Sequence, residues 1–169
     1  MKIKTIKVGF LQENCYILNI ENEALIIDPG DEYEKILEGL NNLELKAILI
    51  THRHFDHIGA LNEFKNIPIY EYKNLEEKEY KIGKFKFEVI YTKGHTSDSV
   101  TYYFKETKDM FTGDFLFKES IGRTDLETGN NEEMKKSIEK IKQYPNVKIY
   151  PGHGEATTLK EEKENNPYL

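Results

Sequence analysis

A cluster of potential metal ligands occupies one short stretch of the chain. His52, His54, Asp56 and His57 fall within six positions, in the pattern His-x-His-x-Asp-His. Imidazole nitrogen suits zinc, iron, copper or nickel, and a carboxylate adds a hard oxygen and a negative charge. Since the adjacent Asp56 and His57 cannot easily share one face with both His52 and His54, the spacing favours two metal ions, one on each side of the loop.

The alternative interpretation of this stretch is a solvated polar loop. Against it, the chain has only five histidines, and three of them are in the cluster. The other two, His95 and His153, each lie in a glycine-containing turn after an apolar, strand-like segment. A further segment of this type ends at Asp114. We therefore expect one concave site, at an edge of a sheet, to collect all these side chains.

Strands and helices must deliver this set to one place. The apolar residues 47–50 predict a buried strand before the cluster, and residues 58–65 predict a helix after it. Alternating or apolar runs predict further strands over residues 2–8, 15–20, 23–27, 67–70, 85–89, 100–104, 109–112 and 147–150. The remaining helices are expected over residues 32–41, 132–143 and 159–165.

Two helix starts and one connector complete the predicted elements. Asp31 is the expected N-cap of the helix over 32–41, and Asn130 with Glu133 has the spacing of a capping box. The charged stretch 74–81 has no periodic apolar face and is interpreted as solvated surface. Mixed sheets with helices on their outer faces would bury the apolar sides of these elements.

Composition narrows the class of protein. With 169 residues, 38% hydrophobic and 32% charged, we expect one globular domain over residues 1–169. The net charge of −6 argues against nucleic acid as a partner. No apolar run approaches the length of a membrane helix, and the first residues lack a signal-peptide core, so the expected location is the cytoplasm. The single cysteine, Cys15, excludes an internal disulfide. The oligomeric state is left open.

The order of these motifs resembles that of the metallo-β-lactamase superfamily. The resemblance covers nearly the whole chain and includes the early motif Ile26-Ile27-Asp28-Pro29-Gly30. The segment from Phe117 to Leu126, and the ending Asn166-Pro167-Tyr168-Leu169, are similar to the short glyoxalase II-like branch, the relatives of hydroxyacylglutathione hydrolase. The resemblance implies the α+β class and an αββα sandwich, with two mixed sheets, outer helices and metal ions at one edge between the sheets.

The resemblance also implies a complete ligand set for two divalent metal ions, with zinc expected first and iron or manganese as alternatives. One ion would be bound by His52, His54 and His95. The other would be bound by Asp56, His57 and His153, and Asp114 would bridge the two. Asp56 would additionally act in catalysis by orienting a hydroxide held between the ions.

Three further residues are candidates for supporting roles. Asp28 is either a partner that hydrogen-bonds a ligating imidazole or a plain Asp-Pro-Gly turn residue. Arg123 offers a planar fork for a substrate carboxylate, or alternatively forms a structural salt bridge with Asp125. Lys118 is a second, weaker substrate-contact candidate.

The implied function is a metallohydrolase that acts on a small thioester, such as an acyl-glutathione or another acyl-thiol, with the dinuclear hydroxide as nucleophile. The alternatives are hydrolysis of another ester, a lactone, a β-lactam or a phosphodiester, and a persulfide dioxygenase with one iron. The sequence departs from full-length glyoxalase II enzymes, because it ends at Leu169, shortly after His153. In those enzymes a further helical region after the last metal histidine supplies part of the glutathione site, so the resemblance implies that a large part of that pocket is absent here.

Overall fold

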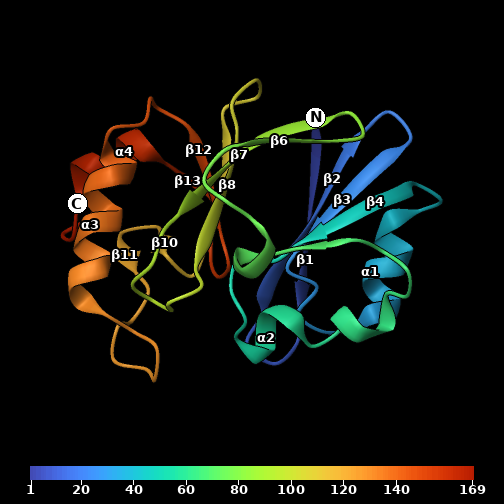
Figure 1. Cartoon of the computed structure of the whole chain (residues 1–169), viewed down its shortest axis with the longest axis horizontal. Helices are drawn as coiled ribbons and strands as arrows, with labels where there is room; N and C mark the ends of the chain where they lie inside the picture. The colour runs from blue at the N-terminus through green and yellow to red at the C-terminus, as the bar shows by residue number, and fades with distance from the viewer.

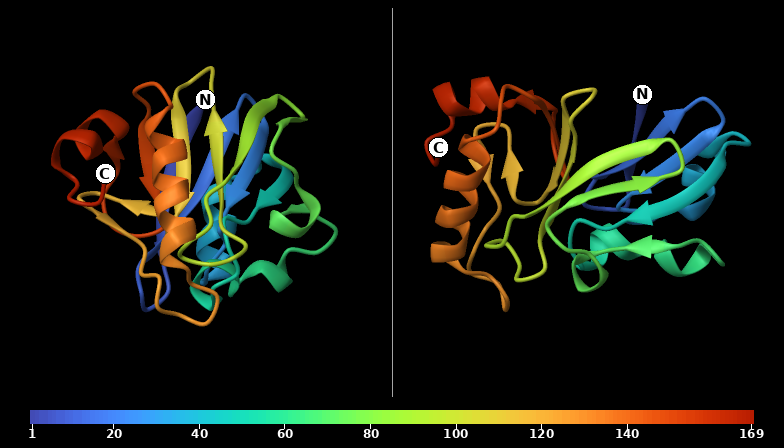
Figure 2. Two further views of the ribbon diagram at one scale, coloured as in Figure 1. Left: turned by 60° about the vertical axis from the view of Figure 1, so that its left-hand side comes forward. Right: turned by 45° about the horizontal axis from the view of Figure 1, so that its top comes forward.

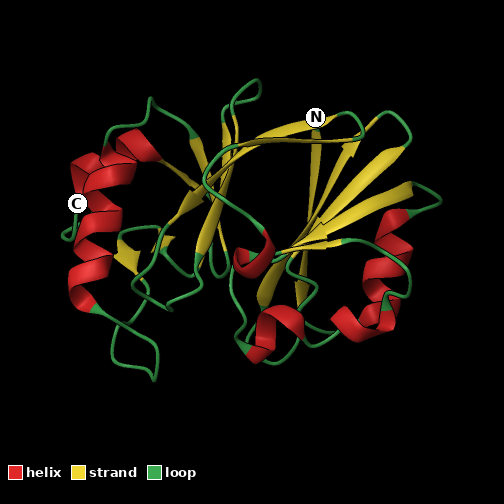
Figure 3. Cartoon of the chain, in the orientation of Figure 1, coloured by secondary structure: helices red, strands yellow, loops and turns green.

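The computed structural model describes all residues, 1–169, and arranges them in four layers (Figure 1). Two sheets lie face to face in the middle, with α1 outside the first sheet and α3 and α4 outside the second (Figure 3). This is the predicted αββα sandwich of the α+β class. None of the helices is long and apolar enough to cross a lipid bilayer.

The first sheet contains five strands in chain order. They are β1 (Lys2–Val8), β2 (Glu13–Ile20), β3 (Glu23–Ile27), β4 (Glu44–Leu49) and β5 (Ile69–Tyr70). The strands β1, β2 and β3 are antiparallel neighbours, whereas β4 and β5 join in parallel. Helix α1 (Tyr33–Leu40) forms the parallel crossover between β3 and β4.

The second sheet contains six strands in the order β13-β12-β9-β8-β7-β6. Their bounds are β6 (Glu79–Ile82), β7 (Phe85–Tyr91), β8 (Val100–Phe104), β9 (Asp109–Gly113), β12 (Lys148–Pro151) and β13 (Thr157–Thr158). Helix α3 (Asn131–Lys142) connects β9 to the parallel strand β12, and α4 (Leu159–Asn165) ends the chain. A small hairpin, β10 (Leu116–Phe117) with β11 (Ser120–Ile121), follows β9.

The alternation of side chains along the strands produces three separate cores. On β3, Leu25 and Ile27 face the cluster between the two sheets, while Ala24 and Ile26 face the cluster beneath α1. A third cluster packs the second sheet against α3 and α4, with Met134 and Ile138 from α3. Because both faces of the central strands are covered, these strands appear in the sequence as continuous apolar runs.

This topology brings the carboxyl ends of four strands from both sheets to the same edge. The metal loop follows β4, His95 follows β7, Asp114 follows β9 and His153 follows β12. The two additional views show these loops together at one end of the sandwich, opposite the hairpin turns (Figure 2). Parallel pairing of β3 with β4, and of β9 with β12, makes their ends coincide.

The helix predicted over residues 58–65 is wrong. The chain instead forms a short helix α2 (Phe55–Ile58), which contains Asp56 and His57, and a 3-10 turn η1 (Leu61–Glu63). The N–H of Ala60 donates to the carbonyl of Pro29 at 3.0 Å rather than continuing the helix. A tertiary contact therefore ends α2 at Ile58, the first residue of the predicted helix.

Two smaller expectations also fail. Asp31 does not cap α1, because Glu32 precedes the helix with a left-handed φ of 50°, and Asp31 Oδ1 accepts the N–H of Glu32 at 2.7 Å instead. The stretch 74–81 is exposed as expected, apart from the buried Leu75 and the half-buried Tyr80, but it is not a connector throughout: Asn74 ends the 3-10 turn η2 (Tyr72–Asn74), and Glu79–Ile82 forms the edge strand β6. Charged residues are common on edge strands because they discourage pairing with other chains.

The N-cap at Asn130 is confirmed. Its side chain accepts the N–H of Glu133 at 3.0 Å, at the start of α3. The hairpin β8–β9 and the terminal helix α4 likewise form where the sequence predicts them.

Candidate metal centre

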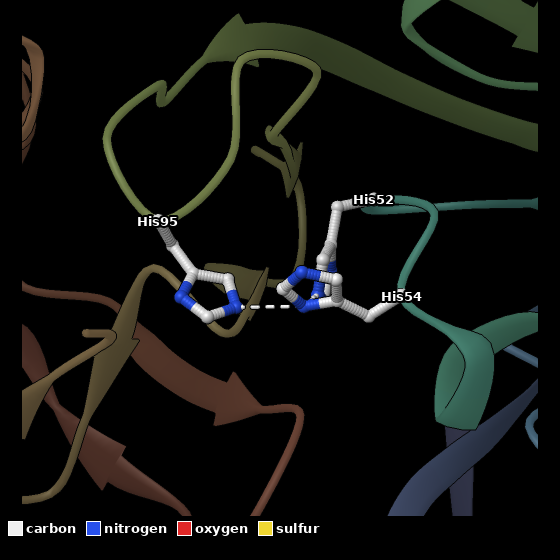
Figure 4. Close-up of side chains that lie close together, drawn as sticks. All are labelled: His52, His54 and His95. Atoms are coloured by element: carbon white, nitrogen blue, oxygen red, sulfur yellow. Dashed lines mark hydrogen bonds between the residues drawn. The ribbon is translucent and has the colours of Figure 1, made fainter. Parts of the chain in front are cut away.

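The first group of potential ligands is a triad of histidines. Nε2 of His52 lies 3.0 Å from Nδ1 of His54, and Nε2 of His95 lies 3.0 Å from the same atom. Figure 4 shows the three rings turned toward a common point from two different loops. Three nitrogens bound to one zinc ion at about 2.0 Å would stand about 3.3 Å apart, so the triad is close to a ligand arrangement.

The second group contains Asp56, His57 and His153, whose ligand atoms also lie within 4.8 Å of one another. Nε2 of His153 lies 3.2 Å from Oδ2 of Asp56, and Nε2 of His57 lies 3.9 Å from that oxygen. Asp56 and His57 come from α2, whereas His153 comes from the loop after β12. The adjacent residues Asp56 and His57 thus contribute to this group and not to the histidine triad.

Asp114 lies between the two groups. Its Oδ1 is 3.3 Å from Nε2 of His57, and its Oδ2 is 3.7 Å from Nε2 of His95 and 3.6 Å from Nε2 of His153. One carboxylate therefore touches both groups, as expected of a shared ligand. The structure brings together all seven residues that the sequence singled out as ligands.

Unpartnered polar atoms in this centre indicate that it is built for cations. Nε2 of His57 and Oδ1 of Asp114 are buried and have no hydrogen-bond partner. A buried polar atom without a partner costs free energy, so its retention requires an explanation such as a bound ion. The donor set of five imidazoles and two carboxylates suits divalent zinc, iron or manganese, so the residues present fit two divalent cations.

Neighbouring charges determine the protonation of the ligands. Burial, followed by the surrounding histidines, lowers the pKa of His52 well below its usual value, which keeps this imidazole neutral. Burial also disfavours the charged form of His57, but the nearby carboxylates of Asp114 and Asp28 outweigh it and raise the pKa of His57. Burial opposes ionisation of Asp114, yet His57 holds the pKa of that carboxyl below its usual value.

Asp28 forms hydrogen bonds with Thr51 and His57 of the metal loop. Its Oδ2 lies 2.9 Å from Nδ1 of His57 and accepts the hydroxyl of Thr51 at 2.6 Å, while Oδ1 accepts the N–H of Thr51 at 2.7 Å. Such a carboxylate fixes the tautomer and orientation of an imidazole whose other nitrogen faces the metal position. The geometry favours the hydrogen-bonding role of Asp28 over that of a plain turn residue.

Replacing Asp28 by asparagine tests this support. The amide removes one of the two oxygen acceptors, so either Thr51 or His57 loses its partner. We expect zinc affinity to fall about 10- to 100-fold, as for other outer partners of metal-bound histidines. Competition with a chromogenic chelator measures the change. Asp31→Asn, in the same turn but exposed, is the matched control and should keep wild-type affinity.

The two predicted substrate contacts are engaged with other side chains. The guanidinium of Arg123 donates from Nε and Nη2 to the carboxylate of Asp125 at 2.7 and 2.8 Å, which is the salt bridge considered as the alternative. Lys118 donates to Glu155 at 2.9 Å. Arg123 still reaches the centre through its backbone, because its carbonyl lies 2.8 Å from Nδ1 of His95 and can accept a hydrogen bond. Substrate contact by either side chain stays a prediction.

A cavity of about 530 Å³ opens beside His54. It is lined by Arg53, His54, Thr96, Ser97, Asp98, Leu126, Glu127 and Thr128. Arg53 is held on its wall by Glu71, a residue only 4% exposed, which accepts from Nε at 2.5 Å and from Nη2 at 3.1 Å. The salt bridge between Arg53 and Glu71 could not be predicted from the sequence, because Arg53 lies among the metal-ligand residues and Glu71 lies in a separate segment.

Glu13 is a second residue that the sequence analysis missed. It is fully buried, both carboxylate oxygens lack hydrogen-bond partners, and Oε1 lies 3.8 Å from Nδ1 of His57. Burial raises the pKa of Glu13 well above its usual value, and the positive charge of His57 only partly opposes this. No local pattern distinguishes Glu13 from the exposed glutamates of the chain.

Comparison with known proteins agrees with this geometry. The family described as the metallo-beta-lactamase superfamily matches residues 8–80 and 67–153. The probable metallo-hydrolase YqgX of Bacillus subtilis is 36% identical, and the match covers 100% of this chain and 98% of that protein. The hydroxyacylglutathione hydrolase GloC of Haemophilus influenzae is 33% identical over 100% of this chain and 98% of its own.

A solved structure gives the same result for the fold. The crystal structure of TTHA1623 in a di-iron-bound form matches with a TM-score of 0.90 and 32% sequence identity. The match covers 98% of this chain and 100% of that one.

Proposed function

The chain belongs to the metallo-β-lactamase superfamily, and on that premise we propose that it is a hydrolase that uses two divalent cations to cleave a small thioester. The observation that carries the proposal is the pair of ligand groups that share Asp114. The thioester class is supported by the relative from Haemophilus influenzae, which is a hydroxyacylglutathione hydrolase and aligns over its whole length.

Each cation has a set of protein atoms to hold it. One would be held by His52, His54 and His95, and the other by Asp56, His57 and His153, with Asp114 shared between them. When bound, such cations polarise a carbonyl group and lower the pKa of a water molecule. We propose zinc in both positions, with iron or manganese as alternatives, and the di-iron form of TTHA1623 supports the number of two.

The side chains of the centre orient the reactants. Asp56 is partly exposed, unlike His57, so its carboxylate can accept a hydrogen bond from the attacking water and aim one lone pair of that water at the carbonyl carbon. Asp114 lies beside the second group, with its Oδ1 3.3 Å from Nε2 of His57. The carbonyl oxygens of Arg123 and Leu11 lie 2.8 and 3.2 Å from Nδ1 of His95 and of His153, which fixes both rings.

The cavity beside His54 is our proposed position for the thiol half of the substrate. Its wall offers hydroxyl groups from Thr96, Ser97 and Thr128, together with the guanidinium of Arg53. A guanidinium has five N–H donors, and Glu71 engages two of those on Arg53, so the others are free for a carboxylate or an amide oxygen. Because Asp98 and Glu127 also line the cavity, a purely anionic group would be repelled from part of it.

Replacing Arg53 by lysine should raise the KM for S-lactoylglutathione about tenfold, because lysine keeps the charge for Glu71 but lacks the planar fork. The steady-state kinetics of the metal-loaded protein measure this. The matched control is Arg123→Lys, since Arg53 and Arg123 are the two arginines of the chain. If Arg123→Lys has the larger effect, the side chain that the sequence singled out is the substrate contact and Arg53 is not.

The proposal also includes a small-molecule substrate, a cytoplasmic location and no nucleic-acid partner. The net charge of −6 supports the last point, since a phosphate backbone would be repelled. The lone cysteine, Cys15, is buried and free, as is usual where disulfides do not form.

A substrate panel tests the proposed function. The metal-loaded protein is assayed on S-lactoylglutathione, on S-acetyl-N-acetylcysteamine, on a chromogenic cephalosporin and on bis(p-nitrophenyl) phosphate, and oxygen uptake is followed with glutathione persulfide. We expect fast hydrolysis of at least one thioester and slow or no turnover of the others. Rapid oxygen uptake, or hydrolysis confined to the cephalosporin or the phosphodiester, would refute the thioesterase proposal.

A further inference from the structure

The loop that carries His153 is held by the opposite sheet. Nδ2 of Asn14, on β2, donates to the carbonyl of Pro151 and to the carbonyl of Gly154, both at 3.0 Å. The backbone N–H of Asn14 donates to the carbonyl of Gly152 at 2.7 Å, and the hydroxyl of Tyr16 donates to that of Pro151 at 2.6 Å. The residues on both sides of His153 are therefore tied to one strand of the first sheet.

The side chain of Asn14 makes no hydrogen bonds other than those to Pro151 and Gly154. Asn14 is 2% exposed, and its Oδ1 is buried without a hydrogen-bond partner. Only the NH₂ end of the amide is therefore hydrogen-bonded. The NH₂ group is the useful end, because it carries two hydrogens and can reach two carbonyls at once. A carboxylate of the same shape would have no donor for either carbonyl.

The contacts of β2 are confined to one of the two ligand groups. Asn14 and Tyr16 hold the loop of His153, and the adjacent Glu13 reaches His57, which belongs to the same group. The histidine triad is oriented by other residues: Thr51 lies 3.1 Å from His52, and the carbonyl of Arg123 lies 2.8 Å from His95. Loss of Asn14 should thus disturb one metal position and spare the other.

We propose that Asn14 is a positioning residue that sets His153 for the metal ion of the Asp56–His57–His153 group. The inference rests on the proposed function, because it requires the two metal positions. It makes the metal affinity of this position depend on an amide in the opposite sheet, so that a change at Asn14 weakens binding there and spares the histidine triad.

The test is zinc binding to Asn14→Asp, measured without any activity assay. Protein stripped with a chelator is titrated with Zn²⁺ in competition with a chromogenic chelator, and native mass spectrometry counts the bound ions. We expect one of the two zinc affinities, the one that His153→Ala also lowers, to fall about 10- to 100-fold, with the other unchanged. The zinc affinity of Asn14→Ser, which keeps one hydrogen-bond donor, should lie between that of Asn14→Asp and that of the wild type.

Asn19→Asp is the matched control. Asn19 lies on the same strand, and its amide also donates to two carbonyls, those of Glu21 and Glu23, at 2.7 and 3.1 Å. Its loss should cost stability without changing either zinc affinity. Far-UV circular dichroism checks that each variant is folded, and the Asn14→Ser variant carries the test if Asn14→Asp does not fold.

Three results would overturn the inference. A wild type with two ions and an Asn14 variant with the same two affinities would overturn it while leaving the proposed function intact. An equal loss of both affinities in folded Asn14 variants would show a general structural role instead. A wild type that binds only one ion would overturn the two-ion proposal and the inference together.

Discussion

Asp114→Ala is expected to lower kcat/KM for thioester hydrolysis about a thousandfold while leaving the fold intact. Asp114 is the one carboxylate that touches both ligand groups, at 3.3 Å from His57 and 3.7 Å from His95. Its removal takes a ligand from each proposed ion and leaves Nε2 of the buried His57 without a neighbouring Asp114 oxygen, while Nδ1 keeps Asp28. Metal ions contribute several kcal/mol to such reactions, and about 4 kcal/mol corresponds to a factor of about a thousand.

The measurement is steady-state kinetics together with the zinc content of the dialysed protein. Asp109→Ala is the control, because Asp109 lies at the other end of β9 and is also largely buried. It should cost stability but keep both the metal and the rate. If Asp114→Ala retained both ions and wild-type turnover, the shared-ligand role of Asp114 would be wrong.

Gly152→Ala is expected to lower kcat/KM for thioester hydrolysis about a hundredfold through a single methyl group. A Cβ at this position would lie 2.2 Å from Oδ1 of Asp114 and 2.6 Å from Cε1 of His57. Both distances are far below van der Waals contact, so the two side chains must move away from their present positions. A displacement of about 1 Å in a catalytic constellation can cost about a hundredfold in rate.

Gly154→Ala, on the other side of His153, separates this effect from a general disturbance of the loop. A Cβ there would meet nothing within 4 Å, although the φ of +80° strains any side chain. We expect a stability loss of about 1 kcal/mol from that strain and little change in rate. The steady-state kinetics and the thermal unfolding of both variants measure these effects. A fully active Gly152→Ala variant with two bound ions would contradict the close contact of Gly152 with Asp114 and His57.

The centre could be predicted from sequence because each ligand follows an apolar strand in a short turn. The pattern around His52 and His57 is local, and the strands before His95, Asp114 and His153 are recognisable by their composition. Once the strands are placed in parallel pairs, their ends must coincide. On β3 every residue from Ala24 to Ile27 is apolar, so the sequence predicts the strand but not which side chain enters which core.

The parts that could not be predicted depend on contacts between distant segments. The end of α2 is set by the hydrogen bond from Ala60 to Pro29, and the fork of Arg53 depends on Glu71. Asn14 acts on residues more than 130 positions away in the chain. None of these partners has a periodic or local pattern, so only the folded structure reveals them.

The most direct test of the account is the rate of S-lactoylglutathione hydrolysis as a function of the zinc added to chelator-stripped protein. We expect no activity without metal, a rise with added zinc, and saturation near two equivalents per chain. Substantial thioester hydrolysis by the stripped protein, or a rate that does not respond to zinc, iron or manganese, would contradict it.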